Sequence, residues 1–357
     1  MVLPISYGPL ETVVVSGLPP VTSINIEVSA EKAVRVASGE FVMVGSGKVA
    51  ANYLSVPVTI VASGDLMFTG YVRDVGIGKG ADERTLNCGF ASRTVDYVEC
   101  SAVHESGEIL NKDIAAIARE LDSYGIGIET DGAKLPVEAI HRISVGESAF
   151  ASVERRARGR RMLIHDTPEG RVKLACKPAG IHRGTLGGGI KILPGATSSF
   201  TEQGRYSETS IRGQATEGIE KQQLRPQATA KDSSVKRRRV LILPHEGEAT
   251  IDRMRERAIW QARRAAGAGV TASIPVTGWR DEGGKIWQPN WLVQVEDDDL
   301  GLDGLMIIKS VNFSQSDMTM ATLSLADPRA LGGDNPRGKT ADGYAAPGVD
   351  DAEYADE

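Results

Sequence analysis

The stretch from Ile274 to Pro328 constrains the fold of this chain most strongly. Short apolar runs follow one another there at regular spacing, and Gly and Asp residues separate them. This pattern is typical of the strands of a small antiparallel barrel or sandwich. Trp279, Trp287 and Trp291 also lie in this stretch, and each indole ring can bury about 150–250 Å² of surface. We therefore expect a β-rich core here, and no residue of the stretch resembles a reacting group.

The composition favours several small domains. At 357 residues the chain has room for two or three of them. Its 40 Gly residues and its 5% aromatic content suit small β-rich domains better than one large α/β core. A formal net charge of −6 argues against broad nucleic-acid affinity. Cys88, Cys100 and Cys176 share no metal-type spacing, so we interpret them as reduced thiols of a protein made in the cytosol.

Targeting signals are not found in the sequence. No apolar run reaches the roughly 18 residues of a transmembrane helix, so we expect no stable membrane insertion. The segment Met1–Ser6 lacks the basic region and the long apolar segment of a secretion signal, so we expect none.

Residues 1–103 are expected to form a first β-barrel module. Apolar runs alternate there with Gly-rich breaks, and we interpret Gly45–Gly47, Ser63–Asp65 and Gly76–Gly80 as turns between strands. The expected strands are Thr12–Val15, Asn25–Val28, Gly39–Val44, Val56–Val61, Leu66–Val72, Arg84–Cys88 and Thr94–Val98.

Residues 104–205 are expected to form an α+β middle region, because the apolar spacing becomes helix-like there. Asn111 is the expected N-cap of a first helix that ends before Gly125, and a second helix follows Ser148. A hairpin over Met162–Ala175, with a turn at Thr167–Gly170, completes the region. The apolar face of the first helix comprises Ile114, Ile117, Ala118 and Leu121, and that of the second comprises Phe150, Val153 and Ala157.

Residues 206–330 are expected to form a second β-barrel module that includes a helix at 250–266. Strands are predicted at Tyr206–Gln214 and Val240–Leu243, ahead of the strands of the Ile274–Pro328 stretch. The remaining residues, 331–357, contain almost no large apolar side chains. They are expected to form a disordered acidic tail, because they cannot bury enough surface to offset their ordering entropy.

The two β modules share a short self-similarity. Tyr71–Val75 resembles Ile307–Val311, and Arg84–Cys88 resembles Ala321–Leu325 at a similar distance downstream. A hydrophobic strand, a loop and a second strand can also look alike by chance. The chain is expected to be mainly β with an α+β insert, and if the similarity is real it carries two related modules. An oligomer of such chains would present twice as many modules as chains in a ring.

Catalytic and ligand-binding motifs are incomplete. Gly45–Lys48 lacks the earlier Gly and the following hydroxyl of a phosphate loop, and no helix pattern follows Gly76–Gly80. The acidic run Glu296–Asp299 with Asp303 does not fit a calcium loop. We therefore predict no catalytic, cofactor-binding or metal-binding residues and no cofactor. The histidines, His104, His141, His165, His182 and His245, are scattered and lack zinc-site spacing.

A basic run, Lys236–Arg239, is the most prominent charged feature. Five arginines of the next predicted helix continue it, and phosphates of a nucleic acid are one possible partner. No aromatic residues interleave with the run, so we favour a solvated face or a contact with an acidic partner. The role of residues 231–239 stays open. The helix arginines are Arg253, Arg255, Arg257, Arg263 and Arg264.

The chain resembles the baseplate hub proteins of contractile-tailed bacteriophages, and specifically the hub family of Mu-like phages. The resemblance extends over residues 1–330, and its most specific part lies between Trp279 and Val295. The basic segment 217–239 and the acidic tail depart from the family pattern. The residues that carry the resemblance are Glu147–Phe150, Arg155–Gly159, Met162–Leu174, Tyr206–Gln214, Arg257–Ala262, Val276–Trp279, Gly284–Asn290, Leu292–Val295, Leu300–Gly301, Leu305–Ile308, Thr322–Leu325 and Pro328.

Membership of this family implies a homotrimer whose two β-barrel modules per chain form a pseudo-sixfold ring. The implied role is to adapt a sixfold tail tube to a threefold spike, with a central channel for non-specific passage of phage DNA. The implied partners are the tail spike (the central puncturing protein), tail tube or tube-initiator proteins, and baseplate wedge proteins. The implied location is the virion tail baseplate, after assembly in the host cytoplasm. A tail-associated cell-wall hydrolase or a receptor-binding β module are the alternatives.

Overall fold

The computed structural model describes residues 10–43, 51–80, 84–157, 162–213, 226–245 and 251–331. The predicted turn at Gly45–Gly47, the loop Gly45–Lys48 and the predicted tail beyond Leu331 lie outside these residues.

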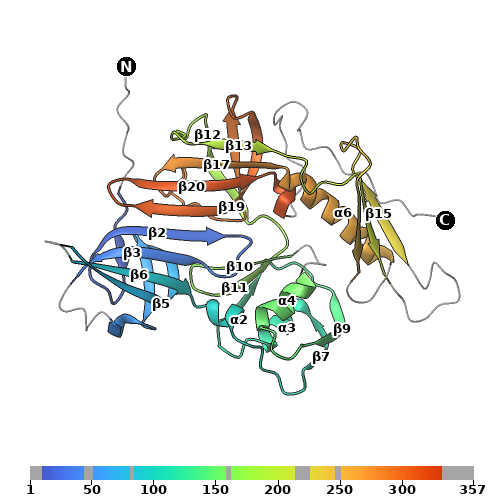
Figure 1. Ribbon diagram of the computed structural model, residues 1–357, viewed down its shortest axis with the longest axis horizontal. Coiled ribbons are helices and arrows are strands. Elements are labelled where there is room, and N and C mark those ends of the chain that lie inside the picture. Colours follow the sequence, from blue (N-terminus) through green and yellow to red (C-terminus); the bar gives the residue numbers. More distant parts are fainter. Residues whose placement is uncertain are drawn as a thin grey trace.

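A twelve-stranded sheet dominates the described residues, and its strands come from both ends of the chain (Figure 1). The fold is therefore mainly β, as the sequence predicts. The N-terminal strands are β1 (Val13–Val15), β2 (Val21–Ser29), β3 (Val36–Val42), β4 (Pro57–Ala62), β5 (Asp65–Lys79) and β6 (Arg84–Ser92), with the short helix η1 (Ala51–Tyr53) before β4. The C-terminal strands are β12 (Gly180–Leu186), β13 (Thr197–Phe200), β17 (Val270–Thr277), β18 (Trp291–Asp297), β19 (Leu302–Gln315) and β20 (Thr319–Ala326), followed by η2 (Pro328–Leu331).

The two halves of this sheet have the same strand order. The N-terminal strands lie in the order β1-β4-β5-β6-β3-β2, and the C-terminal strands in the order β12-β18-β19-β20-β17-β13. Replacing each N-terminal strand by its C-terminal counterpart, in chain order, converts the first arrangement into the second. The directions of pairing also agree, except that β12 runs parallel to β18 whereas β1 runs antiparallel to β4.

Local irregularities repeat at equivalent positions too. A bulge at Arg73 interrupts the pairing of β5 with β6, and a bulge at Lys309 interrupts that of β19 with β20. The self-similarity predicted between Tyr71–Val75 and Ile307–Val311 is therefore confirmed. Before β4 and β18, Ser55 (φ 63°) and Asn290 (φ 60°) both adopt left-handed backbone. Each donates its backbone N–H to the carbonyl just before the bulge, at 2.9 and 2.8 Å respectively.

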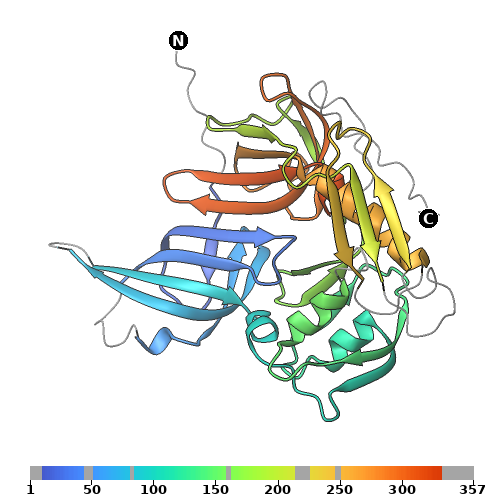
Figure 2. The ribbon, with the colours of Figure 1, turned by 45° about the vertical axis from the view of Figure 1, so that its right-hand side comes forward.

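The middle region packs helices on short sheets below the large sheet (Figures 1 and 2). Its apolar core includes Ile117, Leu121 and Val153, and the predicted helix faces are confirmed apart from Phe150, which is only partly buried. The predicted hairpin is also confirmed, because β10 pairs with β11. The elements are α2 (Val95–Glu99), β7 (Glu108–Asp113), α3 (Ile114–Glu120), β8 (Ile128–Thr130), β9 (Val137–Arg142), α4 (Ala149–Ala157), β10 (Leu163–Asp166) and β11 (Val172–Ala175).

A three-stranded sheet and a long helix stand beside the C-terminal half of the large sheet (Figure 2). The sheet consists of β14 (Glu208–Arg212), β15 (Gln227–Lys231) and β16 (Val240–Pro244), and α6 (Ile251–Ala268) packs on it through Met254, Ala258 and Ala262. The predicted helix at 250–266 is therefore confirmed. Gly267 lets α6 approach η2 closely, since a Cβ there would lie 2.2 Å from the backbone nitrogen of Ala330.

Three local predictions are wrong. Thr94–Val98 is not a strand but leads into α2, because the ring of Tyr97 is buried in the middle core and its hydroxyl donates to Ala118 O. Gly76–Gly80 is not a turn, because β5 continues to Lys79 in register with β6. Asn111 is not an N-cap but lies within β7, and the carboxylate of Asp113 caps α3 by accepting from Ala116 N–H at 2.8 Å.

Strands β12 and β13 belong by pairing to the C-terminal half of the sheet, although the sequence placed them in the middle region. β12 pairs with β18, and β13 pairs with β17. Their own residues are mostly polar or glycine, so their sequence alone does not show this long-range partnership. The limits 1–103, 104–205 and 206–330 stay a proposal for the modules.

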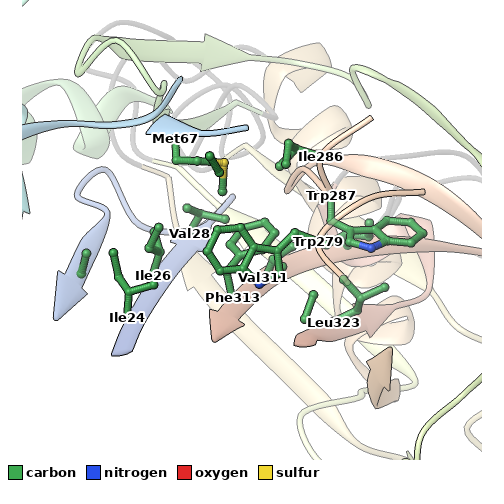
Figure 3. Packing of buried hydrophobic residues seen from close by; sticks show 14 of the residues in the cluster. Ile24, Ile26, Val28, Met67, Trp279, Ile286, Trp287, Val311, Phe313 and Leu323 are labelled. Carbon is green, nitrogen blue, oxygen red and sulfur yellow. The ribbon is translucent and has the colours of Figure 1, made fainter. Parts of the chain in front are cut away.

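The core of the C-terminal half is built around Trp279 and Trp287, which are 0% and 1% exposed (Figure 3). The indole N–H of Trp279 donates to Ser314 O and Met320 O at 3.2 and 3.1 Å. Its ring meets the ring of Phe313 edge to face, with the centroids 5.4 Å apart. Trp279 therefore holds the turn of the β19–β20 hairpin against the core.

We predict that Trp279→Ala lowers the free energy of unfolding by about 3–5 kcal/mol, because it leaves a large cavity in a packed core. Chemical denaturation of the purified chain measures this change. Leu54→Ala is the matched control, since Leu54 is 49% exposed and should change the stability by less than about 0.5 kcal/mol. Equal stability of the two variants would contradict the packing described.

Candidate assembly surface

The junction between the two halves of the large sheet is an antiparallel ladder. β2 pairs with β19 from Ser29 opposite Ser310 to Ile24 opposite Gln315. Beyond the Ser29–Ser310 pair, Ala30 N–H donates to Lys309 O at 2.8 Å. This ladder makes one continuous sheet out of two modules, and no loop or linker separates them at this point.

The inner face of the junction is apolar. Ile26 and Val28 of β2 are 0% and 1% exposed, and so are Val311 and Phe313 of β19. Figure 3 shows these side chains together with Trp279, in one cluster that spans both halves of the sheet. The two modules therefore share a core in addition to their backbone hydrogen bonds.

Charged and polar side chains fasten one end of the junction. Arg280 of the C-terminal half binds Glu11 through two hydrogen bonds, at 2.7 and 3.2 Å, and binds Asp65 at 2.6 Å. The side-chain amide of Gln315 donates to Glu11 O at 2.9 Å and accepts from Glu11 N–H at 3.1 Å. The start of β1 is thereby tied to the end of β19.

Glu31 fastens the other end. Its carboxylate lies 2.8 Å from Lys309 Nζ and 3.0 Å from Arg264 of α6. All three side chains are partly exposed, so we expect this network to add specificity more than stability. It links β2, β19 and α6.

Burial and ion pairing act in opposite directions on Glu11. Burial alone raises its pKa, but hydrogen bonds from Arg280 and Ser63 outweigh burial, and the pKa lies below its ordinary value of 4.5. The same contacts with Glu11 raise the pKa of Arg280. The pair is therefore charged throughout the neutral range.

On the outer face of the sheet, the side chains across the junction are small and polar. A shallow concavity of about 540 Å³ lies over strands β2, β3, β5, β6 and β19. Among the described residues that line it, acidic side chains occur (Glu40 and Asp74) and Lys and Arg do not. The remaining lining residues are Ser23, Ile24, Asn25, Ser38, Gly39, Gly76, Asn87, Cys88, Gly89, Ser314, Gln315 and Ser316. The described lining residues thus offer hydroxyls, amides and carboxylates but no cations for phosphates.

Two buried histidine pairs resemble catalytic dyads but have no access to a substrate. His141 Nε2 lies 2.8 Å from Ser152 Oγ, and both residues are 0% exposed. Burial, followed by the charges of Arg156 and Arg155, lowers the pKa of His141 to about 4. His182 uses both ring nitrogens, because Nδ1 pairs with Asp281 at 2.8 Å and Nε2 accepts from Gln288 N–H at 3.1 Å.

The remaining histidines and the acidic run lie at separate places in the described structure. His104 pairs with Glu120 near the surface, and His165 is buried in β10, where its pKa falls to about 4. The acidic run at Glu296–Asp299 forms the end of β18 and the turn into β19. Within the described ranges no three His, Cys, Asp or Glu residues come together as a metal site. His245 follows β16.

The basic run lies at the edge of the small sheet. Lys236, Arg237 and Arg238 are exposed, whereas Arg239 stacks over Tyr206 and donates to Glu202 O.

The cysteines are free thiols, and burial raises the pKa of Cys88 to about 11. Helices of the described segments are all too short or too polar to cross a bilayer.

Sequence reasoning missed the residues that matter most at the junction. Glu11 and Arg280 are 269 positions apart, and neither lies in a recognisable motif. The one signal that could have indicated Glu11 and Arg280 is the pairing of a single Glu with a single Arg on two edge segments. The spacing of residues along the sequence does not encode such a pairing.

We predict that Glu11→Gln lowers the free energy of unfolding at pH 7 by about 1–3 kcal/mol, since it removes charge-assisted hydrogen bonds. In the wild type the pKa of Glu11 is lower in the folded state than in the unfolded state. Its stabilisation is therefore present above about pH 4.5 and is lost as the pH falls further.

The variant should lose less stability than the wild type between pH 5 and pH 3, roughly, because the glutamine amide cannot titrate. Urea unfolding across this range measures both effects. Asp317→Asn, in the exposed β19–β20 turn, is the control and should follow the wild type at neutral pH. A pH dependence of Glu11→Gln identical to that of the wild type would contradict the assignment.

The sequence and the fold both match phage tail proteins. Residues 94–176 match the family described as baseplate hub protein gp44-like, second domain, and residues 250–333 match Mu phage baseplate assembly protein GpP, fourth domain. The baseplate hub protein gp44 of Escherichia phage Mu is 26% identical over 251 residues, which are 67% of this chain. The alignment spans 65% of that relative, which is less than two thirds of its length.

Solved structures give the same result. The 43 kDa tail protein of prophage MuSo2 from Shewanella oneidensis is 26% identical, with a TM-score of 0.76 over 89% of this chain and 98% of that protein. A tail protein from Neisseria meningitidis shares the fold at 17% identity, with a TM-score of 0.75 over 92% and 100% of the two chains. In sequence and fold the chain is therefore similar to the baseplate hub proteins of Mu-like bacteriophages, and two of its segments match domains of such proteins.

Proposed function

We propose that three copies of this chain form a ring that acts as the structural hub of a phage tail baseplate. The observation that carries the proposal is the repeated six-strand order, joined into one sheet by β2 and β19. Three chains with two such modules each supply six similar units around one axis. A ring of this kind has the threefold symmetry of a spike and the approximate sixfold symmetry of a tube.

The proposed partners follow from the two symmetries. The tail spike would bind the face of the ring that presents threefold features, and tail tube or tube-initiator proteins would bind the opposite face. Baseplate wedge proteins would surround the ring. The proposed location is the virion tail, with assembly in the host cytoplasm.

The proposed role is not enzymatic. The relatives are named as hub and tail proteins, and the buried His141 and His182 pairs already use their ring nitrogens within the protein. Trp279 and Trp287 are buried in the core, so they do not form the exposed aromatic platform of a carbohydrate-binding module. These observations support a structural hub over the hydrolase and receptor-binding alternatives.

We further propose that the outer face of the large sheet lines the central channel. A sheet that continues around a ring turns one face to the cores of the modules and the other to the axis. The concavity with Glu40 and Asp74 lies on that other face. Because its described lining residues offer carboxylates and no cations, DNA would pass without being held by its phosphates.

We predict that the purified chain has a mass in solution of three times 38.0 kDa. Light scattering coupled to size exclusion measures this mass at micromolar concentration. A monomer at every concentration tested would overturn the proposed ring.

We predict that Glu40→Lys with Asp74→Lys makes the ring bind a short DNA duplex, because three chains then place six new cations around one channel. Fluorescence anisotropy at several salt concentrations measures the binding, which should weaken steeply with salt. Asp298→Lys with Asp299→Lys adds the same charge on the β18–β19 turn and is the matched control. Equal affinity of the two variants would contradict the placement of the channel.

A further inference from the structure

Among the strand edges without a strand partner in the described residues, two matter here, one on β5 and one on β13. On one side β5 pairs with β6 along its whole second half, but its pairing with β4 on the other side ends at Tyr71. The edge from Asp74 to Lys79 is therefore open. At the far end of the sheet β13 pairs with β17 alone, so its outer edge is open as well.

The repeat identifies these two edges as counterparts of the junction inside the chain. Strand β5 corresponds to β19, and β13 corresponds to β2. Two rows of paired residues fix the correspondence residue by residue. The first row crosses β5, β6, β3 and β2 through Val72, Phe90, Ala37 and Ile26. The second row crosses β19, β20, β17 and β13 through Ile308, Leu325, Ala272 and Ser198.

We infer that β13 of one chain pairs antiparallel with the second half of β5 of the next chain, and so repeats the β2–β19 ladder between chains. The inference rests on the proposed ring. The register follows from the correspondence, since Val28 opposite Val311 and Glu27 opposite Asn312 inside the chain become Phe200 opposite Val75 and Ser199 opposite Gly76 between chains. The ladder would extend from Asp74 opposite Thr201 to Lys79 opposite Ala196.

The exposure of apolar side chains on β5 supports this pairing. Val311 and Phe313 are 0% and 1% exposed in the junction inside the chain. Their counterparts on β5 are Val75, which is half-buried, and Ile77, which is 47% exposed. An inward-facing Ile left open in the isolated chain is expected where a second copy supplies the cover.

Part of the junction inside the chain has no counterpart in the proposed contact between chains. Lys309 corresponds to Arg73, but Glu31 corresponds to Gln203, so the ion pair of Lys309 with Glu31 has no counterpart between chains. Ile26 corresponds to Ser198, which makes the inner face less apolar than the junction inside the chain. The contact between chains is therefore expected to be weaker than the contact within the chain.

Disulfide cross-linking tests the register directly. The bond from Ala30 N–H to Lys309 O indicates, by alternation along the ladder, that Glu27 and Asn312 form a non-hydrogen-bonded pair. The side chains of such pairs approach most closely. Their counterparts are Ser199 and Gly76, and a Cβ at Gly76 would meet only Asn87, at 3.8 Å or more. We therefore combine Gly76→Cys and Ser199→Cys in one chain and oxidise it.

We expect covalent dimers and trimers on a denaturing gel without reductant, with the trimer as the largest product. Glu27→Cys with Asn312→Cys is the positive control, because it should form a disulfide inside one chain and no cross-linked dimer. Each single variant should stay uncross-linked. Gly76→Cys with Val14→Cys, which places the second thiol on the exposed β1 edge, should also stay uncross-linked.

The outcomes separate this inference from the proposed ring. A trimer by light scattering that gives no cross-link between positions 76 and 199 would overturn the strand pairing and leave the ring intact. A monomer by light scattering would overturn both. Mixing the two single variants before oxidation should give a dimer that contains one chain of each kind, and its absence would also count against the pairing.

Discussion

The ladder between β2 and β19 is the interaction on which the rest of this structure depends. It joins strands almost three hundred residues apart, and it places the inner faces of both modules in one apolar cluster. Backbone pairing sets the relative register of the modules, because a slip by one residue would turn Ile26 and Val28 away from the core. The ion pairs of Arg280 with Glu11 and of Lys309 with Glu31 then hold the two ends of the ladder.

A duplicated module explains why such a junction suits assembly. Each module has one edge that can accept a strand (β5 or β19) and one strand that can be donated (β2 or β13). Inside the chain one acceptor and one donor are used, so one of each remains. A head-to-tail contact of this kind closes into a ring when its rotation divides a full turn. The outer face of the sheet, with its small polar side chains, crosses the same junction. In the proposed ring this face would form a continuous wall without any change.

The sequence showed the strands and the repeat, but it did not show which strands pair with each other. Period-two patterning located β2, β4 and β20, and the apolar face of α6 located that helix. The match of β6 to β20 was displaced by two residues, since the paired rows set Arg84 against Thr319 where the sequence comparison set it against Ala321. A shift by two leaves the alternation unchanged, so patterning cannot detect it. The pattern of the short run at Thr94–Val98 was ambiguous as well. The burial of Tyr97 decides between strand and helix there.

Long-range polar contacts lay beyond sequence reasoning. Nothing in the residues around Glu11 indicates Arg280, and nothing in the polar strand β13 indicates β17. The family resemblance led to the proposed ring, whereas the register of the repeat indicates where the chains of such a ring would meet. The ring and the contact between chains both depend on one property, which is that the two modules share a strand order and the bulge in β5 and β19.

Electron cryomicroscopy of the isolated particles tests the central claim most directly. We expect a ring with a central hole whose end-on images have threefold symmetry and a strong sixfold component, since the two modules of each chain are alike. A compact particle with no hole, or a ring whose end-on images lack the sixfold component, would contradict it.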